Sequence, residues 1–492
     1  MQPTDSGRVK SFVPPAFSKP VGLDRKRIAV LPFTNISPDP QDSYFAEGLT
    51  EELITTLCQL HGLQVIARTS TSQYVGTSKS VSQIGTELQA GSVVEGSVRK
   101  SGNKIRVTTQ LIETVAQAHL WAEQYDRDLI DIFLIQSDIA KHIANGLSVA
   151  LLSGEETRIE KRETESVAAH IAYLKGRTLL HDRSEKALRD ALGQFELAIK
   201  NDPNYARAYA ALADTYNILG SWTFASRAEC LEKSKVFVKK ALELDQNLPE
   251  AHVSLALIHR LEYRFSESAE EYKRAIALIP SDATAHRWYS SCLLDLGRQK
   301  EALSEILRAE ELDPLSMIIN SGALTQFLFL GDDGEVLKRL QKAREIDPEG
   351  PITLSNMAFY YEFKSDYDQA LACYNKIKEI WPGSLYAATA NSEIGWIYAV
   401  TNRRREAMEI AERMQADFNA GIPTVGATEI AGVYLGLDDL DECFKWLEKA
   451  YDAHEDYLYG AFRFNPQLEN ARRDPRFNAL LKKANLPIEP VK

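Results

Sequence analysis

Few side chains in this sequence have the spacing of a metal centre. The acidic run at residues 438–442 could attract a cation, but it lacks the spacing and the glycine of an EF-hand loop. We interpret it as a solvated turn. His252 and His259 stand seven residues apart in one predicted helix, which indicates core packing rather than metal binding. The sequence therefore predicts no metal site.

Motifs for nucleotide or nucleophilic chemistry are also missing. The sequence contains no GxxxxGK(S/T) phosphate loop, no GxGxxG and no HExxH. A nucleophilic serine or cysteine would need a base and an oxyanion donor, and neither can be named. The five cysteines lie far apart without a CxxC pair: Cys58, Cys230, Cys292, Cys373 and Cys443. We expect buried thiols in a reducing, cytoplasmic compartment, no cofactor and no enzymatic activity.

Composition favours a soluble protein of several domains. The chain has 492 residues, of which 44% are apolar and 26% are charged. Its net charge of −12 argues against direct binding of nucleic acid, which needs a basic face. The N-terminus has no apolar segment typical of a signal peptide, and no run of 18 apolar residues predicts a membrane span.

Residues 27–152 have the pattern of an α/β domain. An apolar run at 27–33 predicts a strand buried on both faces, and a helix is expected from Tyr44 to Gly62. Its acidic pair, Glu51 and Glu52, is expected early in that helix, where the helix dipole favours negative charge. Further strands are expected at 63–66, 92–100, 104–113 and 119–125, and further helices at 81–88 and 132–152.

A second, longer region is a repeat. Four prolines stand 34 residues apart: Pro280, Pro314, Pro348 and Pro382. Mostly small residues recur five and twelve positions before them, and bulky residues recur eight positions before. Such a helical hairpin cannot bury its own apolar face and must stack on its neighbours, while proline ends its second helix. We predict an all-α superhelix, a helical-hairpin solenoid.

The domain boundaries follow from these patterns. We predict a flexible tether at 1–26, a charged connector at 153–167 and about seven hairpins over 168–463. A terminal helix and tail over 464–492 would cap the stack.

Both regions resemble known families. The 34-residue pattern resembles the tetratricopeptide repeat (TPR). The first domain carries the strings Ile28-Ala29-Val30-Leu31-Pro32-Phe33, Tyr44-Phe45-Ala46, Val65-Ile66-Ala67-Arg68, Glu95-Gly96-Ser97-Val98-Arg99 and Tyr125-Asp126-Arg127. It is similar to the TolB-N-like (FlgO-like) α/β domain. In that family the domain precedes TPR arrays in CadC-like winged-helix regulators, class III adenylate/guanylate cyclases and some serine/threonine kinases. The resemblance implies a regulatory module whose effector domain is encoded upstream of this sequence.

A TPR superhelix offers a groove lined by the first helix of each hairpin. The repeat register places seven candidate residues there: Arg207, Asn217, Arg260, Arg287, Phe329, Phe359 and Phe363. Aromatic side chains beside arginines suit an extended or helical peptide with acidic groups. Alternatively, Phe329 and Phe359 pack against neighbouring hairpins. The Lys/Asn arrangement of carboxylate-clamp TPRs is not reproduced, so a chaperone C-terminus is not an expected partner.

Three hypotheses about function follow. The first is a non-enzymatic TPR scaffold for protein–protein interaction, with the α/β domain docked on the first hairpins and a protein segment in the groove. The second is the small-molecule-sensing half of an adenylate cyclase, kinase or winged-helix transcription system. Its ligand would bind between the α/β domain and the first hairpins. The third makes the α/β domain an enzyme, and no set of residues supports it.

Overall fold

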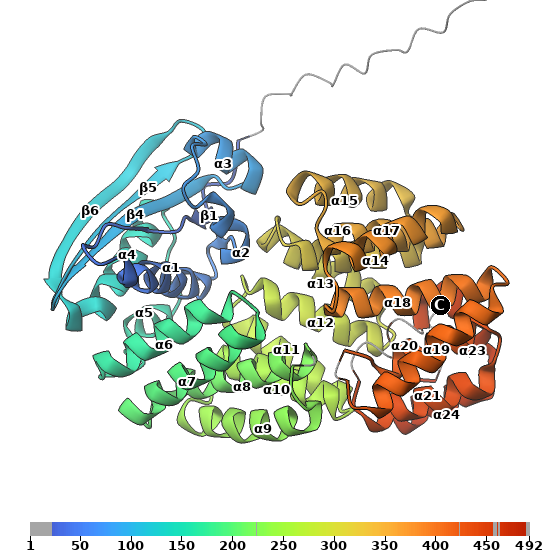
Figure 1. The fold of residues 1–492 in the computed structure, drawn as a ribbon. Helices are drawn as coiled ribbons and strands as arrows, with labels where there is room; N and C mark the ends of the chain where they lie inside the picture. Colours follow the sequence, from blue (N-terminus) through green and yellow to red (C-terminus); the bar gives the residue numbers. More distant parts are fainter. Residues whose placement is uncertain (1–21, 223, 423, 456–459, 461–462, 489–492) are drawn as a thin grey trace, which may run out of the picture.

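An α/β domain leads into a long series of helical hairpins in the computed structural model (Figure 1). The structure describes residues 22–488 except 223, 423, 456–459 and 461–462. The predicted tether therefore lies almost entirely outside the described residues, and its boundary at 26 stays a prediction. The same holds for the boundaries at 152 and 167.

The sheet of the α/β domain is mixed. Its strands are β1 (Arg27–Val30), β2 (Thr34–Asn35), β3 (Gln64–Val65), β4 (Ser92–Ser101), β5 (Lys104–Glu113) and β6 (Ala118–Asp128). They are ordered β3-β1-β4-β5-β6, and β2 also pairs with β4. β1 runs parallel to β3 and β4, whereas β4, β5 and β6 form an antiparallel meander. Gly102, at φ +61°, makes the tight turn between β4 and β5.

Helices cover both faces of this sheet. They are α1 (Ser43–Cys58), α2 (Arg68–Thr71), α3 (Val81–Leu88), α4 (Ile132–Gly146) and α5 (Glu155–Glu160), together with the short 3₁₀ turns η1 (Pro40–Asp42), η2 (Ser72–Tyr74) and η3 (Leu129–Asp131). α1 and α4 share a core with Val30 and Val94, and α3 packs with Ala29 and Val93 on the opposite face. α4 ends at Gly146, before the predicted 152, and Ser148 just beyond it has φ +53°.

Eight hairpins follow within the described residues, where the sequence predicted about seven. Their helices are α6 (Val167–Leu180), α7 (Glu185–Asn201), α8 (Ala206–Ser221), α9 (Arg227–Leu244), α10 (Pro249–Leu261), α11 (Phe265–Leu278), α12 (Ala283–Asp295), α13 (Gln299–Leu312), α14 (Met317–Leu330), α15 (Asp333–Ile346), α16 (Pro351–Phe363), α17 (Tyr367–Ile380), α18 (Leu385–Val400), α19 (Arg404–Asn419), α20 (Ala427–Gly436) and α21 (Leu440–Asp452).

Close contact between paired helices explains the small residues of the repeat. A Cβ atom on Gly176 of α6 would lie 2.5 Å from the Phe195 ring of α7. Ala302 and Ala309 of α13 are fully buried in the same way. Because larger side chains would push the helices apart, the repeat tolerates only small ones at these positions.

The C-terminal end differs from the single helix that we predicted. It consists of η4 (Pro466–Leu468), α23 (Glu469–Arg473) and α24 (Pro475–Lys483). Asp474 between the last two is extended, with ψ 133°, and its side chain accepts a hydrogen bond from the backbone N–H of Arg476. Pro475 then starts a new helix, since it has no N–H to continue the old one.

The array curves until its last hairpin meets its third (Figure 1). The ring of Tyr451, on α21, stacks on Tyr263, just after α10, with centroids 4.4 Å apart. His454 Nδ1 lies 2.7 Å from the Leu261 carbonyl oxygen, and the N–H of Gly460 donates to Asp295 Oδ1 at 2.9 Å. The concave side between α10 and α12 is therefore closed by the chain itself.

Candidate functional site

One helix, α1, joins the α/β domain to the hairpins through buried charges. Its Glu51 carboxylate contacts Arg177 of α6 and lies 3.1 Å from Nε2 of His181, the residue that follows α6. Glu52 Oε2 lies 2.5 Å from Arg207 Nη1 on α8. Both glutamates and Arg207 are only 6–7% exposed. We call these five residues the domain seam.

These contacts decide the charge state of the seam. Burial by itself raises the pKa of Glu51, but Arg177, His181 and Arg68 outweigh it and hold that pKa well below its ordinary value. Glu52 likewise raises the pKa of Arg207, against the effect of burial. Glu51 and Arg207 therefore stay ionised, and removing the partner of either one would leave a buried charge without compensation.

The acidic pair of α1 corrects an expectation from the sequence. Because α1 begins at Ser43, Glu51 and Glu52 stand in the middle of the helix rather than in its first turn. The helix dipole acts mainly on the terminal turns, so it does not explain these side chains. Their function is to pair with arginines of the array.

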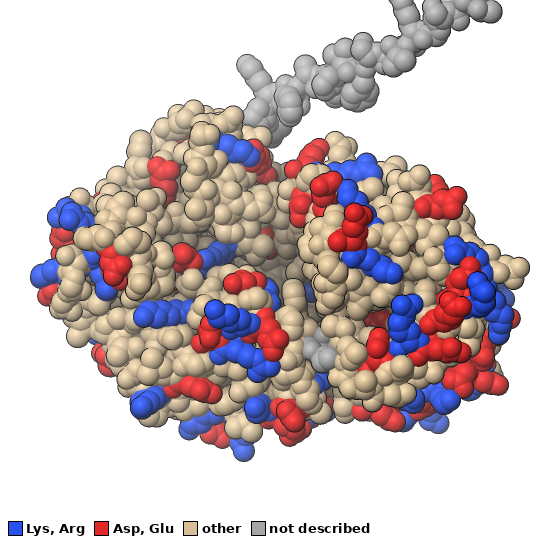
Figure 2. All heavy atoms as spheres, in the orientation of Figure 1, with Lys and Arg blue, Asp and Glu red and all other residues tan. Residues whose placement is uncertain are grey.

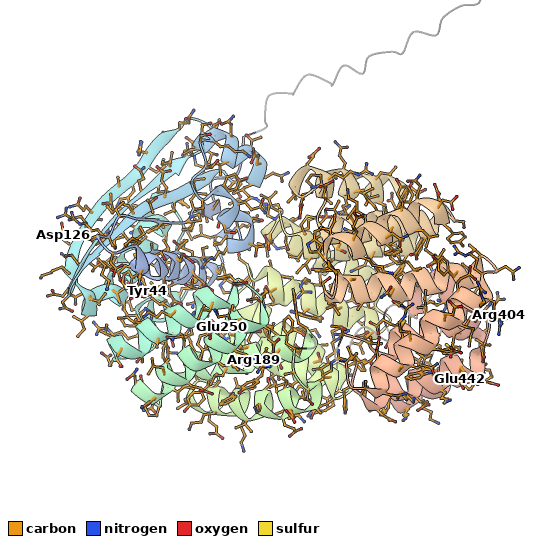
Figure 3. All side chains as sticks on the ribbon, viewed as in Figure 1. Tyr44, Asp126, Arg189, Glu250, Arg404 and Glu442 are labelled. Atoms are coloured by element: carbon orange, nitrogen blue, oxygen red, sulfur yellow. The ribbon has the colours of Figure 1, made fainter. Side chains whose placement is uncertain are left out.

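The seam is flanked by two further contacts of the same kind. Lys175 Nζ of α6 lies 4.8 Å from the centre of the Tyr44 ring of α1. Glu250 Oε1, on α10, lies 3.5 Å from Arg207 Nε. Tyr44 and Glu250 are both labelled in Figure 3 on the side where α1 meets the hairpins. The charges of the seam therefore continue within the array, from α8 to α10.

Contacts of the α/β domain reach as far as the fourth hairpin. Ser70 Oγ, in α2, donates to Asp313 Oδ1 at 2.5 Å and accepts from the Leu315 N–H at 2.8 Å. The Ala67 N–H donates to the Leu312 carbonyl at 2.8 Å. The sequence did not predict α2, since its run of Thr and Ser has no helical periodicity. Docking is therefore broader than the predicted contact with the first hairpins.

A shared apolar core reinforces the seam. The ring centroids of Phe133 on α4 and His170 on α6 are 4.4 Å apart. Tyr173 in turn packs on Phe195 and Tyr205, at 5.9 and 5.1 Å. The four rings other than His170 belong to one buried cluster that also contains Leu53 of α1 and Val94 of β4. The α/β domain and the first hairpins should therefore unfold together.

His170 makes this junction sensitive to acid. Burial, and to a lesser degree the charge of Arg207, lower the pKa of His170 from 6.5 to about 3. Between these values the unfolded chain binds a proton that the folded chain does not. The contribution to stability is thus complete above pH 6.5 and is lost as the pH falls.

We expect protonation of His170 in the unfolded chain to lower the free energy of unfolding by about 2 kcal/mol as the pH falls from 6.5 to 5. The limiting slope is ~1.36 kcal/mol per pH unit. Urea denaturation at several pH values measures it. The variant His170→Asn should have a flatter profile over this interval. An unchanged slope in the variant would show that His170 does not titrate in this way.

Three of the predicted groove residues are buried in the structure. Arg207 belongs to the domain seam, and Arg260 Nε lies 2.6 Å from Asp295 Oδ2. Asn217 is only 6% exposed. In this conformation these three residues are not available to a peptide. Their role in peptide binding stays a prediction.

The other four residues remain partly accessible. The Arg287 guanidinium carbon lies 4.0 Å from the centre of the Trp288 ring. Phe329, Phe359 and Phe363 form a triad with centroid separations of 6.5, 6.1 and 5.0 Å. Phe329 and Phe359 thus pack across neighbouring hairpins, as the alternative stated, while each keeps part of its surface exposed. We call the three rings the aromatic triad.

The surface is hollowed between the α/β domain and the later hairpins (Figure 2). Asp214, on α8, is exposed to solvent, yet burial by the protein around it raises the pKa of its carboxyl. Arg183 is a nearby cation that opposes this shift. An exposed but strongly desolvated carboxyl is typical of the inside of a deep hollow.

No metal centre is found in the part of the chain that the structure describes, where no three His, Cys, Asp or Glu side chains cluster as ligands. The five cysteines are buried and free. Burial raises the pKa of both Cys292 and Cys443 to about 12, so neither thiol is reactive at neutral pH. Among the described residues, no helix has both the length and the apolar character needed to span a bilayer.

Comparison with known proteins gives regulators and TPR proteins. Residues 24–142 match the family model described as HilA/YgeH-like transcriptional regulator, second domain. The chain is 36% identical over 232 residues to the putative adenylate cyclase 3 of Rhizobium meliloti (strain 1021). This alignment covers 47% of this chain and 39% of the cyclase. It is also 26% identical over 294 residues to the transcriptional regulator HilA of Salmonella typhimurium. That alignment covers 58% of this chain and 51% of HilA. The chain thus spans about half of these relatives or less.

One solved structure that resembles this chain is that of PilW, a type IV pilus biogenesis factor. The TM-score is 0.36 and the identity is 17%, and the match covers 44% of this chain and 97% of PilW. Another is the Cut9–Hcn1 complex, with a TM-score of 0.42, 15% identity and coverage of 69% and 63%. Residues 24–142 thus resemble the second domain of HilA/YgeH-like regulators, and the hairpins have the TPR-like architecture that the 34-residue repeat predicts. The finer TolB-N-like assignment stays a prediction.

Proposed function

We propose that this chain is a regulatory interaction module of a signalling system, which transmits binding at its TPR-like hairpins to an effector. The observation that carries the proposal is the domain seam. Two buried ion pairs, Glu51–Arg177 and Glu52–Arg207, and a continuous core tie the α/β domain to the array, so that a change in one part reaches the other. The names of the two relatives, a cyclase and a transcriptional regulator, support a regulatory role.

The proposal includes three finer statements. The α/β domain is of the TolB-N-like kind, the effector is a separate cyclase, kinase or winged-helix domain, and the chain itself catalyses no reaction. Five buried, unreactive thiols suit the reducing cytoplasm in which such systems act.

Arg287 provides a test of partner binding, because it is the predicted groove arginine that lies outside the seam and the Asp295 contact. We expect Arg287→Glu to reduce recovery of the protein partner bound in the groove about tenfold or more in a quantitative pull-down with the full-length chain. The matched control is Arg189→Glu on the outer helix α7 (Figure 3), which should change nothing. Identical partners from wild type and Arg287→Glu would contradict the proposal.

A second candidate function is small-molecule sensing in the hollow beside Asp214. The exposed, desolvated carboxyl and the neighbouring Arg183 are groups that a polar metabolite could contact. A saturating ligand at 100 times its Kd stabilises the folded state by about 2.7 kcal/mol, which raises Tm. A metabolite panel should then contain a compound whose Tm shift is lost in Asp214→Asn. A panel without any such shift would argue against direct sensing.

A further inference from the structure

The concave face of the later hairpins combines aromatic and acidic side chains. The aromatic triad lies on α14 and α16, and Glu362 directly precedes Phe363. Phe359 and Glu393 are each the ninth residue of their helices, α16 and α18, and therefore occupy equivalent positions in successive repeats. We call the triad, Asn356, Glu362 and Glu393 the acidic–aromatic wall.

Two polar atoms of the acidic–aromatic wall lack partners. Within the described residues, Asn356 Nδ2 has no acceptor and Glu362 Oε1 has no donor. Asn356 is 4% exposed and Glu362 is 2% exposed, so water does not replace these bonds freely. Asn356 Oδ1 is already used, since it accepts from Ser321 Oγ at 2.7 Å. Buried polar groups are rarely left unpaired, so these two atoms leave hydrogen-bonding capacity unused on the helix that carries Phe359 and Phe363.

The acidic–aromatic wall also lacks a cation. Glu393 is partly exposed and makes no ion pair with any residue that the structure describes. Burial and the charge of Glu429 raise the pKa of Glu393 to about 7, and burial and Glu393 raise that of Glu362 well above its usual value. Among the described residues, no lysine or arginine opposes either shift, although a hydrogen bond with Tyr374 acts to lower the pKa of Glu362. In the domain seam, by contrast, every buried glutamate meets an arginine.

We propose that residues 8–19 of this chain bind the acidic–aromatic wall, with a lysine at Glu393 and a phenylalanine on the aromatic triad. This segment carries Arg8, Lys10 and Lys19 without an acidic residue, in a chain of net charge −12. It also carries Phe12 and Phe17. Pro14 and Pro15 favour an extended conformation, which lowers the entropic cost of binding.

The segment is long enough to reach the wall. Arg27 Nη2 donates to the Glu311 carbonyl at 2.5 Å, at the end of α13 and next to α14. Lys10 lies 17 residues before Arg27, and an extended chain of that length spans up to about 55–60 Å. α14, with 14 residues, is only about 21 Å long. The proposal rests on the proposed function, since it names an occupant of the TPR-like groove, and it reverses the predicted preference for an acidic peptide.

Zero-length cross-linking tests the contact directly. A carbodiimide joins a lysine ammonium and a carboxylate as an amide, with loss of water, when the two groups touch. In the full chain, diluted so that it stays monomeric, we expect an amide between Glu393 and Lys10 or Lys19. Phe359→Ala with Phe363→Ala should lower its yield at least fivefold. Glu409→Gln, an exposed position on α19, is the matched control and should not change it.

Affinity in trans provides the second measurement. A labelled peptide of residues 8–19 should bind the full-chain variant Arg8→Glu, Lys10→Glu, Lys19→Glu at least tenfold more tightly than the wild type, whose own segment competes. Adding Glu393→Gln should weaken this binding at least tenfold, while Tm shows that the chain stays folded. Equal binding of a charge-reversed peptide, or cross-links of the segment only to other surfaces, would overturn the proposal.

The two proposals fail in different ways. If the cross-link is missing while Arg287→Glu still releases the effector, only the segment is misassigned. If the cross-link forms but no effector depends on Arg287, the proposed function fails and the internal contact stands.

Discussion

Replacing Arg207 by alanine is expected to lower the free energy of unfolding by about 3–5 kcal/mol and to detach the α/β domain from the hairpins. The change would leave Glu52 buried without a counter-charge, since its carboxylate lies 2.5 Å from the guanidinium. It would also remove the cation near Glu250. Urea denaturation measures the loss, and hydrogen exchange in α1 should rise with it.

The control for this variant is Arg189→Ala on α7. Arg189 pairs with Glu185 one helical turn away, and both side chains are about half exposed. Such surface pairs contribute only about 0.3–0.5 kcal/mol. A double variant, Arg207→Met with Glu52→Leu, should recover most of the stability, because apolar groups of similar size avoid burying a lone charge. A loss below about 1 kcal/mol in Arg207→Ala would contradict the role given to the seam.

Phe195→Ala is expected to cost about 3–5 kcal/mol, since the ring is fully buried against Gly176 and Tyr173. Because the core is continuous with that of the sheet, the α/β domain should melt with the first hairpins in one transition at a lower Tm. Differential scanning calorimetry with near-UV circular dichroism detects this. Leu197→Ala, on the same helix but 43% exposed, is the control and should change Tm little. Two separate transitions in Phe195→Ala would show that the cores are independent.

The predicted groove shows where sequence reasoning stops. The repeat register identifies residues on the first helices, and the aromatic triad does lie together there. The register does not say whether another part of the chain already binds a residue. Arg207 and Arg260 have acidic partners at sequence separations of 155 and 35 residues, in Glu52 and Asp295. No local pattern marks Glu52 or Asp295 as those partners.

The sequence by itself determined the local architecture of this protein. The 34-residue spacing of prolines specifies helical hairpins, and apolar alternation specifies most of the sheet, because both depend on steric effects between residues near in the chain. Only the tertiary structure decided which charges meet. Docking of α1 and closure of the array onto Tyr263 bring together groups far apart in sequence, and burial then fixes their ionisation. The unpaired glutamates of the acidic–aromatic wall are recognisable only once their surroundings are known, since a lone charge is unfavourable only where water is excluded.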